Sequence, residues 1–172
     1  MARLPRRICF IGPECTGKTT LAWRLAVDLG FGYVPEYARE YAEARENHLS
    51  ASDVEPIARG QMANQDAAPD AAVLDTDLIS TVVYARFYYG SCPQWIEAEA
   101  RGRRADLYLL MDTDLEWFAD AARDTGGEAR EDLFDRFRAA LDEFETRWMI
   151  VSGVGEERWA RVLEATSRDL RG

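Results

Sequence analysis

An eight-residue run near the amino terminus, GPECTGKT at residues 12–19, restricts the possible folds of this chain more strongly than any other segment. It matches the spacing G-x-x-x-x-G-K-[ST], follows the apolar run ICFI and precedes the helix-favouring run TLAWRLAVDL. In such a strand–loop–helix unit, glycines let backbone amides turn inward, and the positive end of the helix attracts phosphate oxygens. The alternative is a glycine turn that binds nothing. We expect a phosphate-binding loop and hence a P-loop NTPase fold.

The residues of this loop have distinct expected roles. Gly12 and Gly17 allow the backbone to turn, and Lys18 is expected to reach the β- and γ-phosphates of a nucleoside triphosphate. Lys18 is also the only lysine, since the other 20 of the 21 Lys and Arg residues are arginines. The hydroxyl of Thr19 is expected to ligate Mg²⁺, with Thr20 as a second candidate. The predicted cofactors are ATP and Mg²⁺, and the predicted nucleotide-binding residues here are Gly12, Pro13, Glu14, Cys15, Thr16, Gly17, Lys18, Thr19 and Thr20.

Five short apolar runs predict buried strands, and helical patterns separate them. The predicted strands are Arg7–Ile11, Phe31–Pro35, Ala72–Asp75, Leu107–Met111 and Trp148–Ser152. The predicted helices are one from about Gly17 to Gly30, then Glu36–Glu46, Ala51–Gln65, Leu78–Tyr89, Leu115–Ala122 and Glu156–Leu170, and a further 3–4 pattern runs from Leu133 to Trp148. A capping box is expected at Ser52. Strands that alternate with helices imply an α/β fold, with a five-stranded parallel sheet covered by helices on both faces.

Length and charge restrict the class of protein. The 172 residues suffice for one domain with its own core. The formal net charge of −10 argues against broad binding to nucleic acid or to an anionic membrane, and no apolar run approaches the length of a membrane span. The three cysteines lack the spacing of a zinc or redox pair, which favours a reducing compartment, so we expect a cytoplasmic protein.

Two carboxylates follow the third predicted strand, at Asp75 and Asp77 in AAVLDTDL. Ligands of open parallel sheets bind at the carboxyl ends of strands, and an aspartate there can hold Mg²⁺ or accept a proton from an attacking hydroxyl. We assign the metal to Asp75. Asp77 is either a substrate contact or the cap of the helix that begins at Leu78. The two carboxylates can converge only if the chain turns at Thr76.

Charged residues also follow the second predicted strand, in the run EYAREYAEARE. Glu36 and Arg39 are expected at the same edge of the sheet as the phosphate loop. Glu36 can accept a hydroxyl proton or bind a ribose diol, and Arg39 can hold a phosphate or orient a carboxylate. The alternative is an ordinary solvent-exposed helix of mixed charge.

Four segments together carry a resemblance to a known family: the phosphate loop, VPEYAREY, VLDTDLISTVVY and YLLMDTDLEWFADAARDTGGEAR. They resemble the nicotinamide riboside kinase domain of NadR-type proteins, over nearly the whole chain from about Ile8. The resemblance implies a stand-alone kinase domain over residues 1–172 that transfers the γ-phosphoryl group of ATP to the 5′-hydroxyl of nicotinamide riboside, giving nicotinamide mononucleotide. The alternatives are a kinase for another nucleoside or small alcohol, and a regulatory ATP-binding switch without an acceptor. The oligomeric state stays open.

The resemblance also implies roles for individual residues. The expected catalytic residues are Lys18, Asp75, Glu36, Arg123 and Arg130. The two arginines belong to an expected lid over residues 123–130, RDTGGEAR, that closes on the transferring phosphate; the alternative is surface ion pairing. The expected acceptor-binding residues are Glu36, Tyr37, Arg39 and Asp77. Gly153 and Gly155 are expected beside the adenine, or serve only as turn residues.

One departure from the NadR pattern concerns the aromatic side chains that sandwich the nicotinamide ring in that family. Pro35 occupies the first expected aromatic position, and Met62, Ala63 and Asn64 surround the second. The candidates to replace them are Tyr37, Tyr84, Tyr88, Tyr89 and Trp95.

Overall fold

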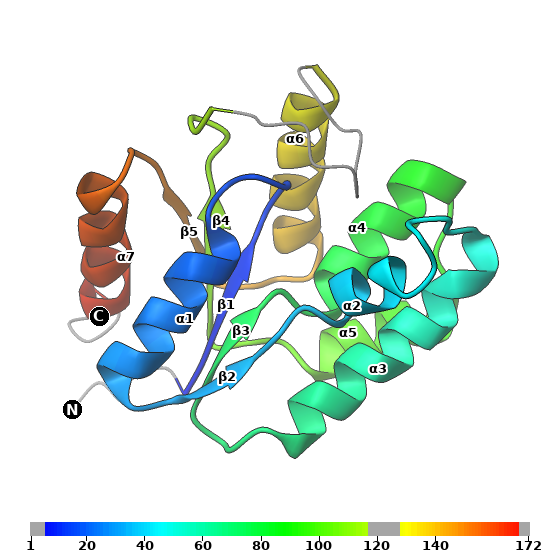
Figure 1. Cartoon of the computed structure of the whole chain (residues 1–172), viewed down its shortest axis with the longest axis horizontal. Coiled ribbons are helices and arrows are strands. Elements are labelled where there is room, and N and C mark those ends of the chain that lie inside the picture. The colour runs from blue at the N-terminus through cyan, green and yellow to red at the C-terminus, as the bar shows by residue number, and fades with distance from the viewer. Residues whose placement is uncertain (1–5, 117–127, 169–172) are drawn as a thin grey trace.

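A five-stranded parallel sheet forms the centre of the computed structural model, which describes residues 6–116 and 128–168 (Figure 1). The strands are β1 (Arg7–Ile11), β2 (Gly32–Val34), β3 (Ala72–Asp75), β4 (Leu107–Met111) and β5 (Trp148–Val151). Their order is β2-β3-β1-β4-β5, so β1 is central and pairs with β3 and β4. The predicted α/β fold with a five-stranded parallel sheet is confirmed.

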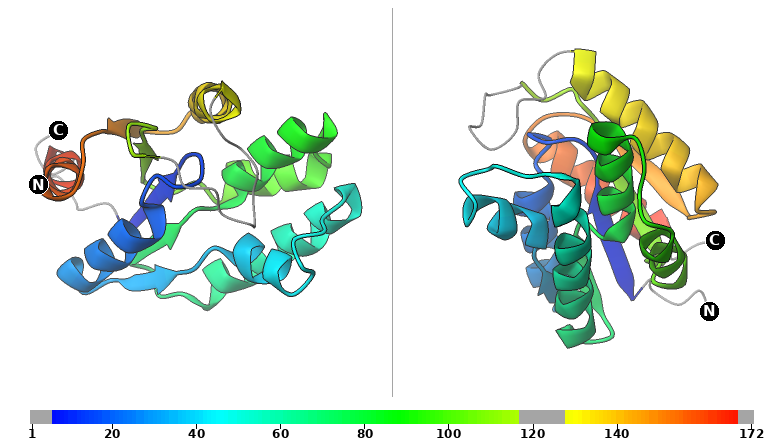
Figure 2. Two further views of the ribbon diagram at one scale, coloured as in Figure 1. Left: turned by 45° about the horizontal axis from the view of Figure 1, so that its top comes forward. Right: turned by 90° about the vertical axis from the view of Figure 1, so that its right-hand side faces the viewer.

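Helices cover both faces of this sheet (Figure 2). They are α1 (Lys18–Leu29), α2 (Tyr37–Glu43), the short 3₁₀ helix η1 (Ala51–Asp53), α3 (Val54–Ala67), α4 (Leu78–Tyr89), α5 (Gln94–Gly102), α6 (Glu128–Glu143) and α7 (Glu156–Arg168). None of the helices within the described ranges is long and apolar enough to cross a membrane.

The alternation of side chains along β1 explains the two layers. Ile8 and Phe10 are fully buried in a core shared with α1 and α7, whereas Cys9 and Ile11 are buried in a second core shared with α3, α4, α5 and α6. Successive side chains of a strand point to opposite faces, so a strand covered on both sides reads as an unbroken apolar run. This double burial places β1, and the loop that follows it, at the centre of the fold.

Two strands are shorter than predicted. The N–H of Phe31 bonds to Ala26 O at the end of α1 (2.9 Å), so β2 begins one residue later. β2 ends at Val34, because Pro35 has no N–H to donate to a sheet. β5 ends at Val151, and the Ser152 hydroxyl donates instead to Asp112 (2.9 Å).

The helical patterns also differ from the structure in particular places. The 3–4 pattern that runs to Trp148 extends past α6, which ends at Glu143; Glu145 then adopts a positive φ of 53°, and Trp148 opens β5. The capping box lies at Ser50 with Asp53, not at Ser52. The sequence did not predict α5.

The remaining helices begin or end within a few residues of their predicted limits. The second predicted helix, Glu36–Glu46, ends at Glu43, and the last described helix ends at Arg168. Of the helix predicted over Leu115–Ala122, residues 115 and 116 are not helical, and residues 117–122 lie outside the described ranges.

Candidate active site

The phosphate loop lies at the carboxyl end of β1 and leads directly into α1 (Figure 1). Gly12 has a φ of 135°, and a Cβ there would lie 2.9 Å from the carbonyl oxygen of Met111, so both conformation and space require glycine. Gly17, with a φ of 83°, caps α1, whose first turn holds no acidic residue. No carboxylate of α1 therefore competes with a phosphate for the positive end of this helix.

Polar side chains of the loop bond to its own carbonyls and to β3. The Lys18 ammonium donates to Gly12 O (2.9 Å) and Pro13 O (2.6 Å), and Thr16 Oγ1 also donates to Pro13 O (2.8 Å). Thr19 Oγ1 donates to Asp75 Oδ2 (2.6 Å). Of the other predicted loop residues, Pro13, Glu14 and Thr16 are buried, Cys15 is partly exposed and Thr20 is exposed.

Asp75 joins the carboxyl end of β3 to the phosphate loop. The residue is 2% exposed, and Oδ2 accepts from Thr19 and from the Tyr33 hydroxyl (3.3 Å). Its other oxygen, Oδ1, is buried and has no hydrogen-bond partner in the described part of the chain. Burial raises the pKa of this carboxyl, and the negative charge of Glu36 raises it further. A cation bound beside Oδ1 would therefore stabilise the ionised form.

Thr19 and Asp75 suit a magnesium ion that binds together with a nucleotide. Mg²⁺ in such sites takes one or two protein oxygens and completes its octahedron with phosphate and water oxygens. Residues 6–116 and 128–168 contain no group of three or more His, Cys, Asp or Glu side chains that could hold a metal by themselves. The unpartnered Oδ1 of Asp75 and the neighbouring Thr19 hydroxyl fit the first kind of site.

Asp77 lies beyond the turn at Thr76 and is the N-cap of α4. Its Oδ1 accepts from Ile79 N (3.0 Å), and its Oδ2 accepts from the Tyr108 hydroxyl (2.6 Å). The residue is 3% exposed, and burial raises its pKa to about 6. The chain does turn at Thr76, but the two carboxylates diverge, and the contacts of Asp77 are those of the helix-cap alternative; the role of Asp77 as a substrate contact stays a prediction.

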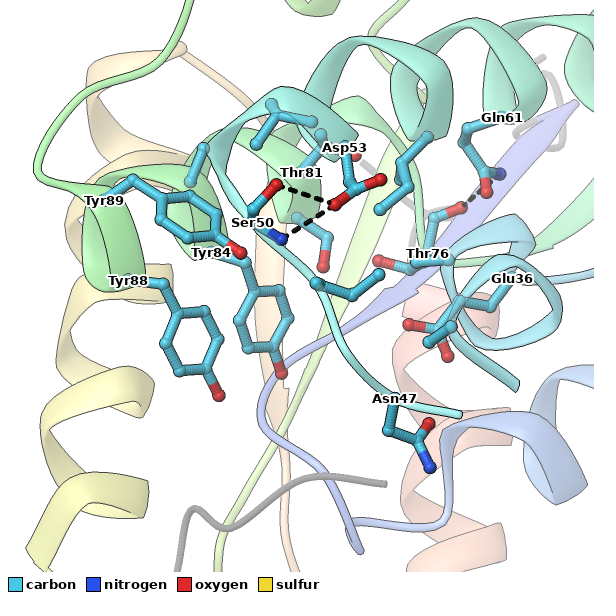
Figure 3. Close-up of a pocket in the computed structure, with 17 residues that line it drawn as sticks. Glu36, Asn47, Ser50, Asp53, Gln61, Thr76, Thr81, Tyr84, Tyr88 and Tyr89 are labelled. Carbon is cyan, nitrogen blue, oxygen red and sulfur yellow. Dashed lines mark hydrogen bonds between the residues drawn. The ribbon is translucent and has the colours of Figure 1, made fainter. Parts of the chain in front are cut away.

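A cavity of about 290 Å³ lies between α2, α3 and α4, next to the turn that follows Asp75 (Figure 3). It is lined by Glu36, Ala38, Ala42, Asn47, Leu49, Ser50, Asp53, Val54, Ile57, Gln61, Thr76, Ser80, Thr81, Tyr84, Ala85, Tyr88 and Tyr89. The described lining contains two carboxylates, Glu36 and Asp53, and no lysine or arginine. The charged groups of the described lining are therefore both acidic.

Three tyrosines of α4 form one end of this cavity, and Glu36 and Thr76 lie at the other end (Figure 3). The rings of Tyr84 and Tyr88 stack with their centroids 6.0 Å apart and their planes within 11°. Tyr89 completes the group, so three of the five candidate aromatic residues face the cavity.

Tyr37 and Arg39, like Asp77, are predicted acceptor residues that are not among those lining the cavity. The ring of Tyr37 covers Gly60 of α3, where a Cβ would meet it at 2.0 Å. Arg39 is half exposed, and its Nε lies 3.8 Å from Glu36 Oε2. Glu36 itself is buried on the cavity wall, so the structure gives Arg39 a contact with Glu36 beside the cavity.

Gln61 is a site residue that the sequence did not identify. It is buried on α3, where its Oε1 accepts from Tyr37 N (2.9 Å) and its Nε2 donates to Thr76 O (3.5 Å). One side chain thus links the start of α2, next to Glu36, to the turn after β3. The only feature of the sequence that could have identified Gln61 was its position as a polar residue within a predicted amphipathic helix.

Arg158 of α7 is a second residue that the sequence did not identify. It is 2% exposed, and its Nη2 donates to Thr16 O (3.0 Å) and to Asp112 O (2.6 Å), while Nη1 donates to Gly153 O (2.9 Å). These bonds tie the phosphate loop to the loops that follow β4 and β5. Gly153 and Gly155 both have positive φ, 96° and 57°, as turn residues of the loop after β5.

Arg130, in the first turn of α6, is also buried against the phosphate loop. Its guanidinium donates to Cys15 O (2.9 Å) and to Leu115 O (2.9 Å). It is therefore not the surface residue of the ion-pair alternative. Arg123, the other predicted lid arginine, lies outside the described residues, as does the segment 123–127 of the predicted lid.

Comparison with known proteins places these features in a family. A family model described as an AAA domain, AAA_28, matches residues 7–158, which include all five strands. The trifunctional NAD biosynthesis/regulator proteins NadR of Salmonella typhimurium strain LT2 and Escherichia coli K12 are 29% and 30% identical over 137 and 146 residues. These matches cover 75% and 80% of this chain but 33% and 36% of the relatives, so the chain spans about a third of their length.

Solved structures agree with this result. A crystal structure of a NadR protein in complex with NR has a TM-score of 0.73 and 25% identity, covering 96% of this chain and 50% of that chain. A NadR structure in complex with NAD and AMP-PNP has a TM-score of 0.70 and 26% identity, covering 95% and 50%. Thymidylate kinase from Ehrlichia chaffeensis has a TM-score of 0.69 at 16% identity over 92% and 96%, which shows a shared fold. The resemblance to NadR-type proteins and the P-loop fold are confirmed.

Proposed function

Because the chain belongs to the AAA_28 family of AAA domains, and its phosphate loop adjoins a cavity large enough for a small acceptor, we propose that it is an ATP-dependent small-molecule kinase. Its acceptor is nicotinamide riboside, and its product is nicotinamide mononucleotide. The observation that carries the proposal is the position of Asp75. Its carboxylate bonds to Thr19 of the phosphate loop, and the next residue, Thr76, lines the cavity.

The nucleotide half of the reaction depends on residues 12–19. Inward backbone amides and the start of α1 bind the phosphates, and the Lys18 ammonium would move from the loop carbonyls to the β- and γ-phosphates. Thr19 and Asp75 would hold Mg²⁺, which when bound neutralises charge on the phosphates. Arg130, whose guanidinium already bonds to Cys15 O, would add a positive charge near the transferring group.

The acceptor half is supported by the charge of the cavity. A phosphorylated acceptor, such as a nucleoside monophosphate, needs arginine or lysine partners, and the described lining offers none. Nicotinamide riboside carries a pyridinium cation instead. The tyrosine wall offers ring faces to such a cation, and Glu36 and Asp53 add negative charge. These features favour a nucleoside with a cationic ring over a nucleotide.

Glu36 is the proposed general base. Asp75 is bonded to Thr19 on the metal side, whereas Glu36 lines the cavity and lies close enough to raise the pKa of Asp75. A carboxylate in this position can accept the proton of the acceptor hydroxyl as the oxygen attacks the γ-phosphorus. Glu36 takes up this proton, and ADP departs as the leaving group.

The test is a panel of acceptors read by ADP release and by the mass of the product. Wild-type chain with MgATP is supplied with nicotinamide riboside, uridine, thymidine, thymidylate or glycerol. We expect nicotinamide riboside to give by far the highest kcat/KM, with a product heavier by one phosphoryl group. Lys18→Ala serves as the inactive control.

Other outcomes separate the alternatives. Preference for a neutral nucleoside would support a kinase but reject nicotinamide riboside as its acceptor. The absence of aromatic residues at position 35 and at positions 62–64 is consistent with that outcome. ADP release that no acceptor stimulates would reject the kinase and favour an ATP-binding switch. Preference for thymidylate would contradict the charge argument.

A further inference from the structure

Thr76 has the most unusual backbone conformation in this site. Its φ is 69°, a left-handed value that side chains with a branched Cβ rarely adopt. Four other non-glycine residues in the described ranges also have positive φ, namely Cys15, Glu46, Asn47 and Glu145. Thr76 alone of the five is both buried and β-branched. Strain of this kind persists where the surrounding structure enforces it, and it concentrates at functional sites.

The Thr76 hydroxyl is buried without a partner. The residue is 4% exposed and lines the cavity, and its Oγ1 has no hydrogen-bond partner among the described residues. Its neighbour Asp75 has a buried oxygen in the same condition. Buried hydroxyls are normally hydrogen-bonded, because leaving one unpaired is costly. The Asp75 oxygen belongs to the proposed metal site beside Thr19, whereas the unpaired Thr76 hydroxyl lies on the cavity wall and indicates a polar ligand there.

The backbone around Thr76 is held on both sides. Its N–H donates to Phe10 O (2.9 Å) on β1, and its carbonyl accepts from Gln61 Nε2 (3.5 Å) on α3. Gln61 also accepts from Tyr37 N, next to Glu36. The Thr76 side chain therefore has a fixed position relative to Glu36, at the end of the cavity opposite the tyrosines (Figure 3).

We infer that Thr76 is a specificity-determining residue whose Oγ1 hydrogen-bonds to a hydroxyl group on the sugar of the acceptor. This inference rests on the proposed function, because it concerns the same cavity. The tyrosines occupy the far end, so the ring of the acceptor points towards them and its sugar points towards Thr76. A hydroxyl both donates and accepts, which matches a sugar hydroxyl and discriminates against an acceptor that lacks one.

The test compares two substitutions and two kinds of acceptor. Thr76→Val keeps the branched Cβ and nearly the same volume but removes the hydroxyl, whereas Thr76→Ser keeps the hydroxyl. With nicotinamide riboside, Thr76→Val is expected to lower kcat/KM about tenfold, the size of one lost hydrogen bond between uncharged groups. Thr76→Ser is expected to stay within about threefold of wild type. With the 2′-deoxy or 3′-deoxy analogue that lacks the bonded hydroxyl, wild type and Thr76→Val should be equal.

Further readouts separate this role from a structural one. The KM for ATP and the Tm of Thr76→Val should match wild type closely, because the hydroxyl has no partner in the described protein. Equal kcat/KM for wild type and Thr76→Val with nicotinamide riboside would overturn the inference while leaving the proposed function intact. If wild type phosphorylates no acceptor, the proposed function fails. Calorimetry of nicotinamide riboside binding then decides the inference, and equal affinity, or no binding, for wild type and Thr76→Val overturns it.

Discussion

Replacement of Asp77 by asparagine tests whether this carboxyl group is a buried helix cap. Asparagine caps helices about as well as aspartate and can still accept from Ile79 N, so the fold should survive. Burial raises the pKa of Asp77 from its ordinary value of 3.8 to about 6. A difference of that size corresponds to about 3 kcal/mol between the two protonation states. Asp77 therefore destabilises the native protein when it ionises.

The sign of the pH dependence follows from the direction of this change. Because the pKa is higher in the folded state, the stabilising contribution of Asp77 is fully present below about pH 4 and is lost as the pH rises through 6. The free energy of unfolding of Asp77→Asn minus that of wild type should thus increase by about 2–3 kcal/mol between pH 4 and pH 7. Taking the difference removes the titration of the other carboxylates.

Urea unfolding followed by tryptophan fluorescence measures both chains, at half-unit steps from pH 4 to pH 7.5. The same variant should keep kcat/KM for the acceptor within about twofold, because Asp77 does not line the cavity. A flat difference in unfolding free energy would refute the buried, protonatable cap. A loss of more than tenfold in kcat/KM with unchanged stability would return Asp77 to the acceptor site.

Three further substitutions test other parts of the site. Asp75→Asn should lower turnover by about 10³-fold, the scale of charge stabilisation in phosphoryl transfer. The control Asp66→Asn affects an exposed ion pair with Arg103 and should change turnover little. A loss of less than twofold in Asp75→Asn would refute the metal assignment. Gly60→Ala should destabilise the wild-type chain by about 1–3 kcal/mol, because the added Cβ meets the Tyr37 ring. In a Tyr37→Ala background the same substitution should stabilise the chain by up to about 1 kcal/mol through helix propensity. Urea unfolding of wild type, the two single variants and the double variant measures both effects. Arg158→Met should lower the unfolding free energy by about 3–5 kcal/mol, because it leaves the buried Thr16 O and the partly buried Asp112 O without their donor, whereas Arg161→Met on the exposed side of α7 should stay within about 0.5 kcal/mol. Similar values for both variants would show that the Arg158 contacts contribute little.

Much of the fold was predictable because its signals are local. Apart from Arg7 at the start of β1 and Asp75 at the end of β3, the runs that became β1, β3 and β4 are uninterrupted and apolar, since strands buried on both faces need no alternation. The phosphate loop was predictable from its glycine and lysine spacing. Residues 144–148 were harder, because Phe144 and Trp148 continue the spacing of α6 although a positive φ at Glu145 ends it.

The site was less predictable where it depends on the direction of side chains. Asp75 and Asp77 look equivalent in the sequence, and only the conformation of Thr76 sends one towards Thr19 and the other towards Tyr108. The buried partners Gln61 and Arg158 act across 15 and 142 residues of chain. No local pattern identifies a polar side chain whose role is to satisfy a distant backbone carbonyl.

The bond from Arg158 to Thr16 has a consequence for synthesis of the chain. The phosphate-binding motif ends at Thr19, but the guanidinium that holds its Thr16 carbonyl belongs to Arg158, which follows Thr16 by 142 residues. A nascent or truncated polypeptide that stops before α7 would carry the motif without this brace. Nucleotide affinity would then depend on the completion of α7, and a chain that stops before α7 would bind ATP more weakly than the full chain.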